Sequence, residues 1–125
     1  MEFKEIKLYG TCSSGGALTV NATTPILGRL YSVRWIDGDF ADGVDAVIST
    51  QNHDAAATLL TLTNADDDAT YYPREQVCSN DGTALTIDDT EILTDFPLMA
   101  GVPRLAVTAG GDEKTGGCIL VYFED

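Results

Sequence analysis

Apolar and polar residues alternate with a period of two along most of this chain, as they do in half-buried β-strands. The segment from Phe3 to Tyr9 is a clear case, because Ile6 and Leu8 share one face while Glu5 lies on the other. No segment has the 3.6-residue spacing of an amphipathic helix. The pattern therefore predicts an all-β protein.

Turn residues divide this pattern into about eight short strands. The expected strands cover residues 3–9, 17–21, 26–36, 44–49, 58–64, 71–78, 105–107 and 118–123, and residues 85–93 form a further segment that alternates only weakly. Glycine, proline, asparagine and aspartate mark the turns, and the loops 10–16 and 51–57 are rich in small and polar residues. Turns at near-regular intervals favour a single antiparallel β-sandwich or jelly-roll-like domain over residues 1–125.

The segment 26–36 is the longest expected strand and carries bulky side chains on both faces. Strict alternation places Leu27, Tyr31, Val33 and Trp35 on one face. Bulk on both faces is typical of a central strand, or of one that a partner covers. We expect Trp35 to belong to the core.

The final strand also has two apolar faces, and it predicts a subunit interface. One face carries Cys118, Leu120 and Tyr122, and the other carries Ile119, Val121 and Phe123. Only one face of a sandwich strand meets the opposite sheet, and fully burying one such side chain is worth roughly 1.5–3 kcal/mol. We expect another subunit to cover the second face, either Leu120 and Tyr122 or the odd-numbered set. Cover by the chain's own loops, 13–16 or 51–57, is the alternative.

Twenty acidic and seven basic residues give a net charge of −13. This charge argues against binding to nucleic acid phosphates and to anionic membranes. No apolar run is long enough to span a membrane, and residues 1–7 lack the apolar centre of a signal peptide. We expect synthesis in a cytoplasm.

Three cysteines leave at least one thiol without a partner in the chain, and their spacing fits no zinc pattern. Cys12 lies in the Ser- and Gly-rich loop 10–16, which we expect to be flexible. It is our candidate for an inter-subunit disulfide. Cys78 and Cys118 lie on expected strands, and we expect them to be inert packing residues.

Two acidic clusters raise the question of calcium. Asn64, Asp66, Asp68 and Glu75 fall at positions 1, 3, 5 and 12 of an EF-hand count, but Ala69 occupies the position that requires glycine. The second cluster, which lacks a suitably placed glutamate, comprises Asp37, Asp39, Asp42 and Asp45. We expect solvated turns and no metal site.

Neither a catalytic set nor a cofactor site emerges from the sequence. His53 is the only histidine, and no serine or cysteine near it in sequence suggests a nucleophile. The glycine pairs at 110–111 and 116–117 bracket a hairpin loop, and no helix follows to bind a phosphate. We therefore expect a protein that is not an enzyme and needs no cofactor.

An ordered series of short motifs runs through the chain from Gly28 onward. The motifs are Gly28–Val33, Asp37-Gly38, Gly43–Val47, Leu60–Asn64, Tyr72–Arg74, Asp81–Leu85, Ala100–Val102, Leu105–Val107, Gly110-Gly111 and Lys114–Gly116. This series resembles short virion structural proteins of tailed bacteriophages from the head and neck region. The resemblance implies a decoration, cement or head–tail joining protein in the virion. Its partners would be major capsid or neck proteins and copies of itself.

Two other classes of binding protein stay open. A carbohydrate- or receptor-binding module would present an exposed aromatic platform, for which Tyr31, Trp35, Tyr71 and Tyr72 are the candidates. Tyr71 and Tyr72 point to opposite faces, so at most one of them lies in the core. A calcium-dependent adhesion domain would use the acidic turns.

Overall fold

A computed structural model describes residues 2–51, 56–76, 83, 86–87, 91–92 and 94–124. Within these residues all regular structure is β, and every strand pairing is antiparallel. The predicted all-β class is therefore confirmed. In this described part no helix is long and apolar enough to cross a membrane.

The strands follow one another along the chain without intervening helices. They are β1 (Phe3–Thr11), β2 (Leu18–Asn21), β3 (Ile26–Ile36), β4 (Asp45–Gln51), β5 (Ala56–Leu62), β6 (Ala69–Tyr71), β7 (Glu75–Gln76), β8 (Thr86–Ile87), β9 (Glu91–Ile92), β10 (Thr94–Asp95), β11 (Leu98–Thr108) and β12 (Thr115–Glu124). The bounds of β3 match the expected 26–36.

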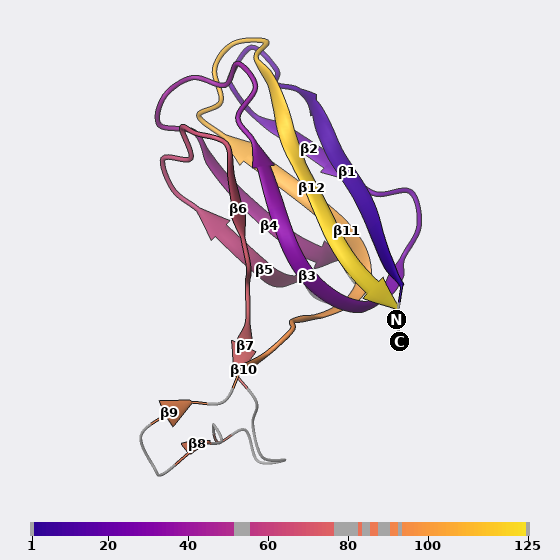
Figure 1. Cartoon of the computed structure of the whole chain (residues 1–125). Coiled ribbons are helices and arrows are strands. Elements are labelled where there is room, and N and C mark those ends of the chain that lie inside the picture. The colour runs from indigo at the N-terminus through magenta and orange to yellow at the C-terminus, as the bar shows by residue number, and fades with distance from the viewer. Residues whose placement is uncertain are drawn as a thin grey trace.

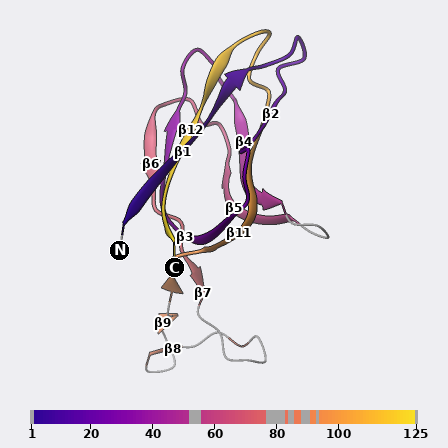
Figure 2. The ribbon, with the colours of Figure 1, turned by 90° about the vertical axis from the view of Figure 1, so that its right-hand side faces the viewer.

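The eight larger strands form two layers of a sandwich. The first layer has the order β1-β12-β3-β6, and the second has the order β2-β11-β4-β5. The layers join at one corner, where Ile26–Arg29 of β3 pairs with Leu98–Gly101 of β11. Figure 2 shows the two layers from the side, and Figure 1 shows them face on. The predicted antiparallel sandwich is confirmed.

The core lies between the two layers and is built from the inward faces of both. Its fully buried side chains include Leu8, Leu30, Val33, Trp35, Ile48, Met99, Leu105 and Leu120. Trp35 stacks on Phe40 with ring centroids 5.6 Å apart, and its Nε1 donates a hydrogen bond to the carbonyl oxygen of Ala65 at 2.9 Å. The expectation that Trp35 belongs to the core is confirmed.

A β-bulge in β3 reverses the alternation of its side chains. Val121 of β12 pairs with Ser32 while Tyr122 pairs with Leu30, so Tyr31 has no partner in this ladder. As a result Leu30 and Val33 are both buried, although three positions separate them. The expectation that Leu27 and Tyr31 share a face with Val33 and Trp35 is wrong, because a bulge inserts one residue and shifts the side-chain period.

Strand β11 is longer than the sequence predicts. It spans 98–108, whereas the sequence predicts a strand only over 105–107. Gly101 has a φ of 129°, a conformation open to glycine, and it lies where β11 leaves β3 and starts to pair with β4. The glycine therefore lets one continuous strand serve both layers.

Strand β12 starts at Thr115, so Gly116 and Gly117 lie inside the strand and not in the preceding loop. A Cβ at Gly117 would clash with the carbonyl oxygen of Leu8, and one at Gly116 would clash with the ring of Phe40. These glycines are a packing requirement. Sequence reading mistook them for loop residues, since glycine is the commonest turn signal.

The expected strand 71–78 is split, as its proline requires. β6 ends at Tyr71, before Pro73, and β7 begins at Glu75. β6 pairs only with β3 in the described structure and is therefore an edge strand. Cys78, His53 and most of the expected strand 85–93 lie outside the described residues. The described parts of that segment are β8 and β9.

Candidate interaction surface

The structure separates the two faces of β12. Leu120 and Tyr122 are 0% and 6% exposed and point into the core, as Cys118 does. They are wrong as interface candidates, because the opposite layer of the same chain covers them. Ile119 and Val121 are half-buried on the outer face of the first layer. Of the odd-numbered set, Phe123 is itself only 8% exposed, so Ile119 and Val121 are the members that solvent reaches.

Phe123 belongs to a cluster of five aromatic rings on this outer face, which we call the aromatic face. Its members are Phe3, Tyr31, Tyr72, Phe96 and Phe123. Adjacent ring centroids lie 5.1–5.9 Å apart, with tilted or edge-to-face geometry. This is the range in which aromatic pairs attract one another. Part of the cover over Phe123 thus comes from Phe96 and Phe3 of the same chain.

The aromatic face continues into an apolar strip across the first layer and the corner. Leu98, Arg29, Phe123 and Phe3 are successive cross-strand neighbours on β11, β3, β12 and β1. Among them Phe3 is 52% exposed and Leu98 is 41% exposed, and beside them Leu27 is 65% exposed and Tyr72 is 56% exposed. Contiguous exposed apolar side chains on a soluble domain mark an interaction site.

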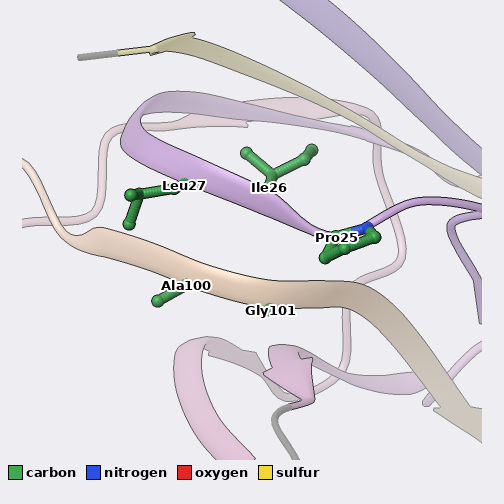
Figure 3. Close-up of a pocket in the computed structure, with 5 residues that line it drawn as sticks. All are labelled: Pro25, Ile26, Leu27, Ala100 and Gly101. Atoms are coloured by element: carbon green, nitrogen blue, oxygen red, sulfur yellow. The ribbon is translucent and has the colours of Figure 1, made fainter.

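A shallow hollow adjoins this strip at the corner of the sandwich. It has a volume of about 390 Å³ and is lined by Pro25, Ile26, Leu27, Ala100 and Gly101. Figure 3 shows these residues on the adjacent strands β3 and β11. The lining is apolar, so the hollow can accept an apolar side chain of a partner but offers no catalytic group.

Two arginines fix the start of the β7–β10 ladder to the aromatic face. Arg29 donates hydrogen bonds of 3.1 Å to the carboxylate of Glu75 and to the carbonyl oxygen of Phe96. The Arg74 guanidinium lies 4.4 Å from the centroid of the Phe96 ring and donates to the carbonyl oxygen of Tyr31 at 3.1 Å. These contacts tie both strands of the ladder to β3. In Figure 1 the ladder leaves the sandwich at its lower end.

The two acidic clusters of the sequence meet at the other end of the sandwich. Asp68 accepts a hydrogen bond from the backbone N–H of Asp37 at 2.8 Å, and Asp66 accepts one from Gly43 at 2.7 Å. Asp67 and Asp68 are exposed, as expected, whereas Asp66 is half-buried. Their carboxylates therefore cap turns. Within the described residues no group of three or more metal-binding side chains is present.

Asp37 is the most perturbed carboxyl group at this end. Burial raises its pKa above the ordinary value, and the nearby Asp66 and Asp68 carboxylates raise it further. One of its side-chain oxygens is buried without a hydrogen-bond partner. A raised pKa means that protonation of Asp37 favours the folded state, so the contribution of this one group to stability is largest at acid pH and is lost as the pH rises through its raised pKa.

Most of the loop around Cys12 is exposed, but the Cys12 side chain is buried, so the expectation that it can reach a neighbouring subunit is wrong. Its side chain is 3% exposed, and a Cβ on Gly110 would clash with its sulfur. Backbone hydrogen bonds from Cys12 to Lys114 and from Gly110 to Gly16 join its loop to the β11–β12 loop. The thiol therefore cannot reach a neighbouring subunit without opening this contact. Cys118 is buried in the core, as expected.

We expect both buried thiols to be unreactive in the folded protein. Burial raises the pKa of Cys118 from 9.0 to about 12, and burial together with the charge of Asp39 raises the pKa of Cys12. Thiolate is the reactive form, so a chromogenic disulfide reagent at pH 8 should leave both untouched in a Cys78→Ser variant and titrate both after unfolding. Stability should also fall as the pH rises from about 9 toward 12, because the unfolded chain releases these protons first. Rapid labelling of the folded variant at pH 8 would contradict the prediction that both thiols are unreactive.

The four aromatic residues proposed for a sugar platform do not share one surface of the protein. Trp35 is in the core, Tyr71 packs against the core, and only Tyr31 and Tyr72 join the aromatic face. The prediction that at most one of Tyr71 and Tyr72 lies in the core is confirmed. Sequence reading missed Phe3 and Phe96, because pairing between distant strands brings them together.

Comparisons of the chain with models of protein families, with curated proteins and with solved structures find no match.

Proposed function

We propose that this protein is a non-enzymatic structural protein of a tailed bacteriophage virion. It binds to the capsid or neck as a decoration, cement or head–tail joining protein and stabilises the particle through subunit contacts. Its partners are major capsid or neck proteins and copies of itself. The family resemblance of the motifs from Gly28 onward supplies the class of protein, and the aromatic face supplies the contact surface.

The exposure of the aromatic face is the observation that carries this proposal. Protein interfaces are enriched in aromatic side chains and arginine at their centres and depleted of lysine and carboxylates. The exposed rings of Phe3 and Tyr72, together with the Arg74 guanidinium over Phe96, supply the aromatic and arginine content on a chain of net charge −13. Exposed apolar surface of this kind marks a site of contact with a partner, and we propose that a partner covers it.

Charge favours a position on the outside of the particle. Packaged DNA presents a dense array of phosphates, and a protein of net charge −13 is repelled by it. The seven aspartates at positions 37–45 and 66–68 gather at one end of the sandwich, away from the aromatic face. We therefore expect the aromatic face to contact the particle and the acidic end to face solvent.

Incorporation into particles tests the proposal. Tyr72→Ser removes an exposed ring from the aromatic face, and we expect isolated virions to lose most of this protein. Tyr9→Ser is the matched control, because Tyr9 is 39% exposed on β1 but contacts none of the five rings. Equal incorporation of both variants, or absence of the wild-type chain from virions, would reject the proposal.

The second candidate is a carbohydrate- or receptor-binding module, which the exposed rings favour. Sugars stack on exposed aromatic rings, and Phe3 and Tyr72 offer two of them. Binding of soluble wild-type protein to a glycan array, lost in Tyr72→Ser and kept in Tyr9→Ser, would favour this candidate. A calcium-dependent adhesion domain has less support, because the Asp66 and Asp68 carboxylates already accept backbone hydrogen bonds.

A further inference from the structure

The two layers of the sandwich have four edge strands, and three of them are protected against pairing with another chain. β1 carries the charged residues Lys4, Glu5 and Lys7, β6 has three residues and is followed by Pro73, and β2 has four residues. Charges, proline and shortness are the usual means by which an edge avoids an additional strand. The fourth edge strand, β5, is the one to examine as a site for pairing with another chain.

The fourth edge, β5, has almost none of this protection. It has seven residues, Ala-Ala-Thr-Leu-Leu-Thr-Leu, with no charge and no proline. It pairs with β4 on one side, and in the described part of the chain no strand pairs with its other side. Its only irregularity is a bulge, where Leu60 pairs with Ile48 and Thr58 pairs with Ser49. A long, uncharged edge of this kind is a template for strand addition.

We propose that β5 pairs antiparallel with β5 of a second copy of this chain about a two-fold axis. The second layers of the two copies, each with the order β2-β11-β4-β5, then form one continuous eight-stranded sheet. A two-fold contact of this kind uses the same residues on both sides and closes after two copies. The proposal does not depend on the phage assignment, because β5 contributes no ring to the aromatic face.

A second copy can pair at this edge without bringing like charges on the two β5 strands together. Two molecules of net charge −13 repel one another, so they meet most readily along a segment without carboxylates. β5 is such a segment, and its exposed side chains include Thr58 and Thr61. Threonine pairs across antiparallel strands are favourable, and they add no repulsion.

Charge also selects the antiparallel direction. Residues Asp66, Asp67 and Asp68 follow the end of β5. Parallel pairing would place these acidic turns of the two copies side by side. Antiparallel pairing separates them by about the length of the strand, roughly 23 Å for seven residues at ~3.3 Å each, which exceeds the Debye length of ~8 Å at physiological salt.

Sedimentation equilibrium of the purified protein over a wide concentration range tests the pairing. We expect the wild type to form a dimer and Thr61→Lys, on β5, to weaken dimerisation by about tenfold or more, because a lysine on an edge strand opposes the addition of another strand. Thr19→Lys is the matched control, since Thr19 is exposed on the protected edge strand β2 and the net charge changes equally. Circular dichroism verifies that both variants fold.

Hydrogen exchange distinguishes this edge from any other self-contact. Amides on the outer edge of β5 should exchange slowly at concentrations where the dimer forms and quickly on dilution. A wild type that is monomeric at every concentration would overturn the proposal. So would a dimer that Thr61→Lys leaves intact, or one without concentration-dependent protection in residues 56–62.

Discussion

Replacing Trp35 with alanine is expected to lower the free energy of unfolding by about 3–5 kcal/mol. Trp35 is fully buried, its ring stacks on Phe40, and its Nε1 donates to the carbonyl oxygen of Ala65. The substitution leaves a large cavity and an unpaired carbonyl. Since small domains are stable by only about 5–15 kcal/mol, this single change should remove much of the stability.

Urea denaturation of the variants measures this effect. Trp35→Phe is the control, because it keeps an aromatic ring near Phe40 while losing the 2.9 Å hydrogen bond to Ala65. We expect it to cost less than the alanine variant. A loss below about 1 kcal/mol for Trp35→Ala would mean that the space between the layers collapses around the missing ring, contrary to a close-packed core.

Replacing Leu120 with aspartate is expected to unfold the domain, whereas Val121→Asp is expected to leave it folded. Leu120 is 0% exposed between the layers, and an ionised carboxylate there would be buried without a partner. Val121 is half-buried on the outer face, where solvent can reach a carboxylate. On the proposed function, the folded Val121→Asp protein should fail to enter particles.

Circular dichroism and the protein content of isolated particles decide between the outcomes for these neighbouring positions. If both variants unfold, the outer face of β12 is part of the core. If both assemble normally, β12 is not an interface. The pair is matched in charge, and the two residues are adjacent in sequence, so their difference reports only which side of the sheet each side chain occupies.

Local alternation was sufficient to predict the class of fold and the bounds of β3. The period of two depends only on the backbone of an extended strand, and charge or turn residues interrupt it where strands end. Alternation failed at Tyr31, because the bulge depends on pairing between β3 and β12, which are far apart in sequence. It failed again at Gly101 and Gly117, where glycine serves a bend and a close approach inside strands.

The candidate surface was less predictable than the fold. The odd-numbered face of β12 was one of two alternatives, and only the register of the sheets decided between them. Phe3, Phe96 and Phe123 come together through contacts that span nearly the whole chain. Cys12 appeared free because its loop is rich in serine and glycine, but Gly110 packs on it from a hairpin about a hundred residues away.

The pairing of β1 with β12 has a consequence for biosynthesis. Phe3 lies opposite Phe123, and Thr11 lies opposite Thr115, so β1 leaves the ribosome long before β12, the strand it pairs with. Translation at about 5–20 residues per second imposes a delay of roughly 6–24 seconds, during which Ile6 and Leu8 lack their final neighbours. Such long-range closure slows folding, and the first layer cannot be completed before β12 has been made. A ribosome stalled before Thr115 would hold a chain whose first layer cannot form, even though most of its strands have already been made.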